Sequence, residues 1–126
     1  MSDKRMLFTK DHEWVVVEGN IARVGITDYA QNELGDVVFV DLPTVGDTVE
    51  EGEGFAVVES VKAVSDVYSP VSGTIVKVNE ELESSPELIN ESPYDQGWIA
   101  EIEIAEGAQL DDLMNAEEYQ AFIKEA

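Results

Sequence analysis

The chain has 126 residues, and its seven Lys and Arg side chains stand against 28 Asp and Glu side chains, which gives a formal net charge of −21. A surface this acidic repels nucleic-acid phosphates and anionic membranes, so we expect neither as a partner. The apolar content of 44% is too high for a disordered acidic tail, and the absence of Cys excludes disulfides, thiolate metal sites and a Cys nucleophile.

The first half of the chain predicts short strands and one short helix. A Gly-Asn turn pair between two strand-like runs indicates a β-hairpin over Glu13–Gly25. Thr27 is suited to cap a helix over Asp28–Leu34, and Gly35 ends that helix. The other strands predicted in this half cover Asp36–Leu42, Thr48–Glu50 and Phe55–Ser60.

The second half continues the pattern and adds a terminal helix. Ser85 as N-cap and Pro at the first helical position predict a helix over Pro86–Glu91. Asn115 and Glu118 form a capping-box variant that opens a C-terminal helix. The strands predicted here cover Ala63–Ser69, Thr74–Val78 and Trp98–Ile104, and Tyr119, Phe122 and Ile123 share one face of the last helix. The length and the many short strands predict one antiparallel β domain over residues 1–126.

One place breaks a local rule. Two predicted strands meet at Val61 and Lys62, where the sequence offers no Gly, Asn or Pro, although tight hairpins usually need such residues. Either the chain turns here and exposes Lys62, or one long strand runs through and Lys62 is an ordinary solvated residue. Nothing in the sequence suggests the desolvation or neighbouring cation that activates a catalytic lysine, so Lys62 suits modification by another enzyme better than catalysis.

The surroundings of Lys62 carry a family resemblance. The segment Glu59-Ser-Val-Lys-Ala-Val-Ser-Asp-Val-Tyr-Ser-Pro-Val-Ser-Gly73 is similar to the lipoylation segment of the H proteins of the glycine cleavage system. The similarity extends over nearly the whole chain. Further matching motifs are His12-Glu13-Trp14, Val24-Gly25-Ile26-Thr27, Leu34-Gly35-Asp36, Leu88-Ile89-Asn90, Ser92-Pro93-Tyr94 and Gly97-Trp98.

The resemblance implies both a fold and a cofactor. The fold is mainly β, a lipoyl/biotinyl-domain-like flattened β-barrel (barrel-sandwich hybrid) of two quasi-symmetric sheets, with short peripheral helices and a C-terminal helix. The cofactor is lipoic acid, amide-linked to Lys62. The resemblance further implies a carrier, not an enzyme. Its partners would be the pyridoxal-phosphate-dependent glycine decarboxylase, a tetrahydrofolate-dependent aminomethyltransferase, dihydrolipoamide dehydrogenase with FAD and NAD, and lipoylating enzymes.

The resemblance also assigns roles to particular residues. It points to Glu59 and Gly73 in recognition by lipoylating enzymes, and for Gly73 a turn that needs a positive φ is a further explanation. Glu13, Asp66 and His12 match a cleft that shields the loaded arm, where acids can hold a protonated amine. The alternative is that these are solvated surface residues. A metal site is not expected, because the chain has one His and no EF-hand spacing.

Other functions stay open from the sequence. A biotin carrier is disfavoured, since biotinyl domains place Met on both sides of the lysine and this chain has Val61 and Ala63. A donor that relays lipoyl groups to other complexes, or a purely structural acidic domain, fits the same residues. With no signal peptide or membrane span, we expect a monomer in a bacterial cytoplasm, or in the mitochondrial matrix if the chain is a processed organellar form. The acidity suits docking onto basic partners, and a salt-rich habitat would also select it.

Overall fold

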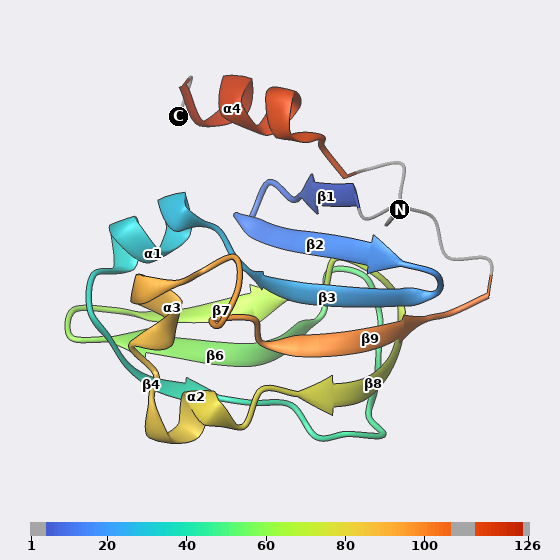
Figure 1. The fold of residues 1–126 in the computed structure, drawn as a ribbon, viewed down its shortest axis with the longest axis horizontal. Helices are drawn as coiled ribbons and strands as arrows, with labels where there is room; N and C mark the ends of the chain where they lie inside the picture. Colours follow the sequence, from blue (N-terminus) through green and yellow to red (C-terminus); the bar gives the residue numbers. More distant parts are fainter. Residues whose placement is uncertain (1–4, 107–112, 125–126) are drawn as a thin grey trace.

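Two antiparallel β-sheets form the computed structural model, which describes residues 5–106 and 113–124 (Figure 1). The larger sheet consists, in spatial order, of β1 (Arg5–Phe8), β2 (Glu13–Glu18), β3 (Ile21–Ile26), β9 (Ala100–Ile104), β8 (Gly73–Val78) and β5 (Thr48–Val49). The smaller sheet consists of β4 (Val37–Asp41), β6 (Gly54–Ser60) and β7 (Val64–Tyr68). The predicted mainly β architecture of two sheets is confirmed, and the sheets differ in strand number.

The core lies between the two sheets. Alternate residues of β6, namely Ala56, Val58 and Ser60, are buried, as expected for a strand with one face toward a core. Ala56 and Val58 belong to one apolar cluster with side chains of the larger sheet such as Ile75 and Ile102. The short helices α2 (Glu81–Ser84) and α3 (Leu88–Glu91) each add one fully buried side chain, Leu82 and Ile89.

The helix α4 (Ala116–Lys124) lies outside β1 at the edge of the larger sheet (Figure 1). Its predicted capping box is confirmed, because Asn115 Oδ1 accepts from Glu118 N at 2.8 Å and Glu118 Oε1 accepts from Asn115 N at 2.9 Å. Tyr119 is buried against Phe8 and Trp14, and Phe122 and Ile123 pack on the same cluster. The predicted apolar face is therefore confirmed as well.

The other predicted elements form within one or two residues of their expected ends, but one predicted helix cap is absent. The helix expected over Pro86–Glu91 begins only at Leu88, and Ser85 gives it no side-chain cap. The reason is that the sequence did not suggest α2, which ends at Ser84 and has Ser85 as its C-cap residue. The Ser85 carbonyl accepts from Leu88 N in a turn between the two helices. The strand β1 also escaped prediction.

The helix α1 (Asp28–Leu34) matches its prediction in full. Thr27 Oγ1 accepts from Ala30 N at 3.2 Å at one end, and Gly35, with φ 83°, closes the other end. No helix in the described part of the chain is long and apolar enough to cross a membrane.

Candidate functional site

The chain reverses at residues 61–63, between β6 and β7. Glu59 pairs with Val64 in the antiparallel register, and Ser60 N donates to Ala63 O at 2.8 Å. Lys62 is exposed within this turn. The prediction of a turn at Val61 and Lys62 is therefore confirmed, and the alternative of one continuous strand is wrong.

The Ser60 hydroxyl explains how this turn forms without glycine. Ser60 Oγ accepts hydrogen bonds from Lys62 N at 3.3 Å and Ala63 N at 3.0 Å, and donates to Ala63 O at 3.3 Å. A serine hydroxyl in this position satisfies backbone groups that a turn leaves free. Among the described residues, His12 is the only non-glycine with positive φ, so Val61 and Lys62 need no left-handed backbone.

A second anchor ties the turn to the segment before β4. Val61 N donates to the carbonyl of Asp36 at 3.0 Å. Asn90 of α3 holds this segment from the other side, since its Oδ1 accepts from Val37 N and its Nδ2 donates to Gly35 O, both at 2.8 Å. The resemblance included Asn90 without giving it a role, and the sequence carries no signal that would place it beside the turn.

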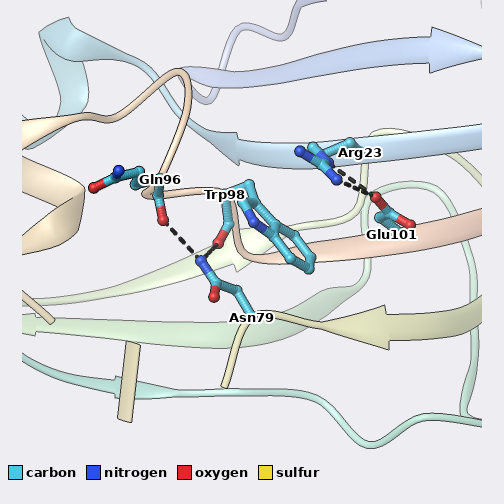
Figure 2. A network of polar contacts seen from close by, with 5 residues as sticks. All are labelled: Arg23, Asn79, Gln96, Trp98 and Glu101. Carbon is cyan, nitrogen blue, oxygen red and sulfur yellow. Dashed lines mark hydrogen bonds and ion pairs between the residues drawn. The ribbon is translucent and has the colours of Figure 1, made fainter. Parts of the chain in front are cut away.

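The Lys62 amine has no carboxylate partner in the described part of the chain. The only ion pair there joins Arg23 and Glu101 on the larger sheet, at 2.6 Å (Figure 2). The Lys62 stem passes Gly35, because a Cβ built on that glycine would lie 3.5 Å from Lys62 Cε. An exposed and unpaired primary amine at a fixed turn suits amide attachment of a carboxylic acid cofactor.

A cavity of about 190 Å³ opens between α1 and β7. His12, Glu13 and Asp66 all line it, so the structure brings together the three residues predicted for a cleft. Its other lining side chains are mostly apolar and include Ile26, Leu34, Val58 and Val67. We call this cavity the α1–β7 cleft. Leu34, which directly precedes Gly35 in the chain, is one of its lining residues.

Glu13 is a buried carboxyl within the cleft wall, with only 2% of its surface exposed. Thr9 Oγ1 donates to Glu13 Oε1 at 2.6 Å, and Tyr68 N donates to Oε2 at 3.0 Å. Burial raises the pKa of Glu13 to about 7, although both hydrogen bonds act in the opposite direction. Glu13 is therefore no solvated surface acid, whereas Asp66 is exposed.

His12 is fixed at the same wall by α4. Its Nδ1 lies 2.8 Å from Tyr119 Oη, which also lies 2.7 Å from Thr27 Oγ1. The ring packs on Tyr29 with a centroid separation of 4.6 Å. The left-handed backbone of His12, with φ 68°, turns the chain into β2, and burial lowers the pKa of its imidazole.

The two residues predicted for recognition lie in different surroundings. Glu59 is half-buried on β6, three residues before Lys62. Gly73 is buried at the start of β8 in the other sheet, and Figure 1 shows this strand end far from the β6–β7 turn.

The expectation that Gly73 needs a positive φ is wrong, because its φ is not in that region. The residue is instead required by a close approach of β8 to β9, where an added Cβ would lie 2.1 Å from Glu103 O. Recognition of Glu59 and Gly73 by lipoylating enzymes stays a prediction.

Comparison with known proteins adds the following findings. The family model "Glycine cleavage H-protein" matches residues 6–126. A glycine cleavage system H protein of Staphylococcus epidermidis is 57% identical over 118 residues, which are 94% of each chain, and one of Halothermothrix orenii is 54% identical over 122 residues, or 97% of this chain and 95% of that one. A crystal structure of a glycine cleavage system H protein from Mycobacterium marinum superimposes with a TM-score of 0.84 at 39% identity, covering 95% of this chain and 97% of that one. This likeness confirms the predicted lipoyl-domain-like fold.

Proposed function

We propose that this chain, which belongs to the glycine cleavage H-protein family, is the lipoyl-bearing shuttle of the glycine cleavage system. In this proposal it carries the aminomethyl group from glycine decarboxylase to the aminomethyltransferase, and reducing equivalents to dihydrolipoamide dehydrogenase. The chain is then a carrier subunit and not an enzyme. The observation that carries the proposal is the exposed Lys62, unpaired among the described residues, at the tip of a hairpin.

The Lys62 amine fits covalent attachment of lipoic acid. Acyl transfer from an activated lipoyl donor forms one amide bond at Nζ, and the amine proton and the activating group leave. The attached cofactor supplies the two sulfur atoms for the chemistry, so a chain without Cys is suited to this role. Tethering keeps the carried group at high local concentration for each partner enzyme in turn.

The chain's own contribution at the base of the arm is a rigid turn. Ser60 Oγ binds the backbone of Lys62 and Ala63, and the Val61 N–H is bonded to Asp36 O. These bonds fix the backbone while the Lys62 side chain remains in solvent. The direction in which the arm leaves the protein is therefore set, and its far end stays free to reach separate active sites.

The α1–β7 cleft is the part of the molecule that we assign to the loaded arm. Its apolar lining suits a hydrocarbon chain, and Glu13 and Asp66 suit a protonated amine, because a charge-assisted hydrogen bond is stronger than a neutral one. His12 lies on the same wall, packed against Tyr29. The roles of Glu13, Asp66 and His12 rest on this shared cavity and on the family resemblance.

The strong negative charge also supports repeated docking. With a formal charge of −21, the chain is attracted to basic surfaces at long range, and such attraction raises association rates. We expect association rates with glycine decarboxylase to fall as salt is added, which stopped-flow mixing measures. Rates that do not change with salt would contradict this part of the proposal. The named relatives are bacterial, in line with our expectation of a bacterial cytoplasmic location.

The attachment site is tested by intact mass measurement of protein purified from its native host. We expect a mass increment of one lipoyl group that maps to Lys62 by peptide sequencing. A Lys62→Arg variant should lose the increment, whereas Lys77→Arg, which changes another exposed lysine, should keep it. An unmodified Lys62 in cells that lipoylate other proteins would overturn the proposal, and a biotinyl increment would favour the biotin carrier instead.

A reconstituted system tests the carrier role itself. Lipoylated wild-type protein should support glycine-dependent CO2 release by glycine decarboxylase together with the other system enzymes, and Lys62→Arg should not. If Lys62→Arg supports the same rate as the wild type, the chain acts as a structural domain and the shuttle proposal fails.

A further inference from the structure

Tyr119 brings a hydroxyl group of α4 to the wall of the α1–β7 cleft. Only 2% of its surface is exposed, and its ring stacks on Phe8 with a centroid separation of 4.7 Å. The hydroxyl oxygen lies 2.7 Å from Thr27 Oγ1 and 2.8 Å from His12 Nδ1. One hydroxyl group therefore connects the N-cap residue of α1 with the imidazole that lines the cleft.

The directions of these two hydrogen bonds follow from the Thr27 hydroxyl. Thr27 is fully buried, and its Oγ1 already accepts from Ala30 N at 3.2 Å. The hydroxyl proton needs an acceptor of its own, because a buried donor without a partner is unfavourable. Among the described residues, the Tyr119 oxygen is the only such acceptor. Thr27 therefore donates to Tyr119, and Tyr119 donates to His12 Nδ1.

The bond from Tyr119 fixes the tautomer of His12. A neutral imidazole carries one N–H proton, and an Nδ1 that accepts a hydrogen bond leaves that proton on Nε2. Burial favours the neutral form, because it lowers the pKa of the imidazole even though Asp11 and Glu33 act in the opposite direction. In the described part of the chain Nε2 has no hydrogen-bond partner, and no buried side-chain nitrogen or oxygen there is without one. The Nε2–H group is therefore accessible to a molecule that binds beside the ring.

We propose that Tyr119 is a positioning residue, which holds His12 in the Nε2–H tautomer so that the cleft wall presents an N–H donor and no basic imidazole nitrogen. This inference rests on the proposed function, in which the cleft holds the protonated amine of the carried group. A donor N–H cannot accept a hydrogen bond or a proton from that amine. The ammonium is thus left to the carboxylates of Glu13 and Asp66, which line the same cavity.

The charge of the amine acts on Glu13 in the same direction. A cation beside a carboxyl favours the ionised form and so lowers the pKa that burial has raised. Glu13 then holds the ammonium through a charge-assisted hydrogen bond instead of taking its proton. An Nε2 lone pair in the same cleft would compete for that proton, and the tautomer set by Tyr119 prevents this competition.

Nitrogen NMR of the apo-protein tests the tautomer. His12 is the only histidine of the chain, so isotope labelling of histidine nitrogen gives signals from this ring alone. We expect the wild type at neutral pH to show a protonated Nε2 and an unprotonated Nδ1. Tyr119→Phe keeps the ring on Phe8 and loses the hydroxyl, so the Nδ1–H tautomer should become detectable. Tyr94→Phe is the matched control and should leave the His12 signals unchanged, because the Tyr94 hydroxyl accepts from Asp28 N at 2.9 Å at the same end of α1.

Two variants of Thr27 distinguish positioning from a general loss of packing. Thr27→Ser keeps the hydroxyl proton and should keep the wild-type signals. Thr27→Val removes that proton while Tyr119 stays in place, so Tyr119 can accept from His12 and the Nδ1–H tautomer should appear. Circular dichroism at the temperature of the NMR measurement shows whether each variant is folded, because a weaker N-cap residue destabilises α1.

A second measurement follows the carried group. Lipoylated protein is loaded with the aminomethyl group and separated from its partner enzymes, and the release of ammonia is recorded. Tyr119→Phe should release ammonia at least about threefold faster than the wild type, because a base beside the ammonium speeds removal of its proton. Tyr94→Phe should release it at the wild-type rate.

The outcomes separate this inference from the proposed function. A chain that cannot be lipoylated at Lys62 would contradict the proposed function, whereas the spectrum of the apo-protein still decides the tautomer. An Nδ1–H signal in the wild type, or unchanged His12 signals in folded Tyr119→Phe, would overturn the positioning role of Tyr119. A changed tautomer combined with unchanged ammonia release would overturn its effect on the carried group.

Discussion

Asn90 and Val37 are joined by a hydrogen bond of 2.8 Å from the Val37 N–H to the Asn90 side-chain oxygen. The amide nitrogen of the same side chain donates to Gly35 O, so Asn90 holds the residues on both sides of Asp36. The carbonyl of Asp36 in turn accepts from Val61 N in the Lys62 turn. The position of the turn thus depends on a side chain of α3, far away in the sequence.

The first prediction concerns this connection. Asn90→Ala leaves the buried Val37 N–H without its partner, and we expect a loss of about 2–3 kcal/mol in the free energy of unfolding. We also expect faster amide hydrogen exchange at Val61 and a slower lipoylation of Lys62, because the turn loses its support. Hydrogen exchange followed by NMR and ligase kinetics measure these effects.

Asn79→Ala is the matched control for this variant. Asn79 is buried directly after β8 and donates to Gln96 O and Trp98 O, both at 2.8 Å (Figure 2). Its loss should destabilise the protein by a similar amount without changing exchange at Val61 relative to the rest of the chain. Equal effects of both variants on Val61 would show that Asn90 acts only through global stability.

The second prediction concerns the hydroxyl that shapes the turn. Ser60→Ala removes the acceptor for Lys62 N and Ala63 N, and we expect a cost of about 1 kcal/mol because water replaces part of what is lost. Exchange of the Ala63 amide should become faster. Ser84→Ala removes a single bond of 3.4 Å on an exposed helix end and should change stability little. A Ser60→Ala protein with unchanged exchange at Ala63 would show that the turn does not need the hydroxyl.

The third prediction separates packing from recognition at Gly73. A Cβ at this position would lie 2.1 Å from Glu103 O and 2.8 Å from Ile102 Cγ2, so Gly73→Ala forces β8 away from β9. We expect a loss of about 1–3 kcal/mol or more in the free energy of unfolding. In Gly54→Ala the nearest atom is 3.8 Å away, and we expect no loss or a small gain.

Lipoylation assays complete that comparison. If Gly73 acts through packing, Gly73→Ala should be modified normally at temperatures where it is fully folded, as judged by circular dichroism. Slow modification of a fully folded Gly73→Ala protein would instead support direct recognition by the lipoylating enzyme.

The elements that sequence reasoning found are those whose signals are local. Thr27 and Gly35 bracket α1, and the Asn115 and Glu118 pair opens α4, because caps bond to groups within a few residues. The start of α3 was misplaced since Ser85 and Pro86 fit a helix start, yet the preceding helix α2 uses Ser85 as its end. Neither Ser85 nor Pro86 by itself indicates that Ser85 is already the C-cap residue of α2.

The position of the site could be predicted from the sequence, but the contacts that support it could not. Lys62 stood out because its turn lacks glycine, and the family resemblance supplied its role. The sequence does not show why the turn forms. Ser60, a residue of β6, bonds the backbone of the turn through its side chain, and Asn90 of α3 bonds the backbone next to Asp36. The sequence also does not show why position 73 needs a glycine. The atom that leaves no space for a side chain there belongs to Glu103, thirty residues further along the chain.

The fourth prediction concerns Glu13 and pH. Burial raises its pKa from 4.5 to about 7, so between these values the folded state binds more protons than the unfolded state. The contribution of Glu13 to the free energy of unfolding therefore falls by about 3 kcal/mol as pH rises from about 4.5 to about 7. Glu13→Gln removes the titration, so its stability relative to wild type should increase across this range.

Chemical denaturation at pH 5 and pH 8 measures this difference. The change in stability between wild type and Glu13→Gln should be more favourable to the variant at pH 8, because only the wild type then carries a buried charge. Glu83→Gln, which changes an exposed acid, corrects for the loss of one negative charge from a strongly acidic surface. If Glu13→Gln and Glu83→Gln show the same pH dependence, the Glu13 carboxyl ionises as freely as a surface acid, and the cleft wall is open to water at that point.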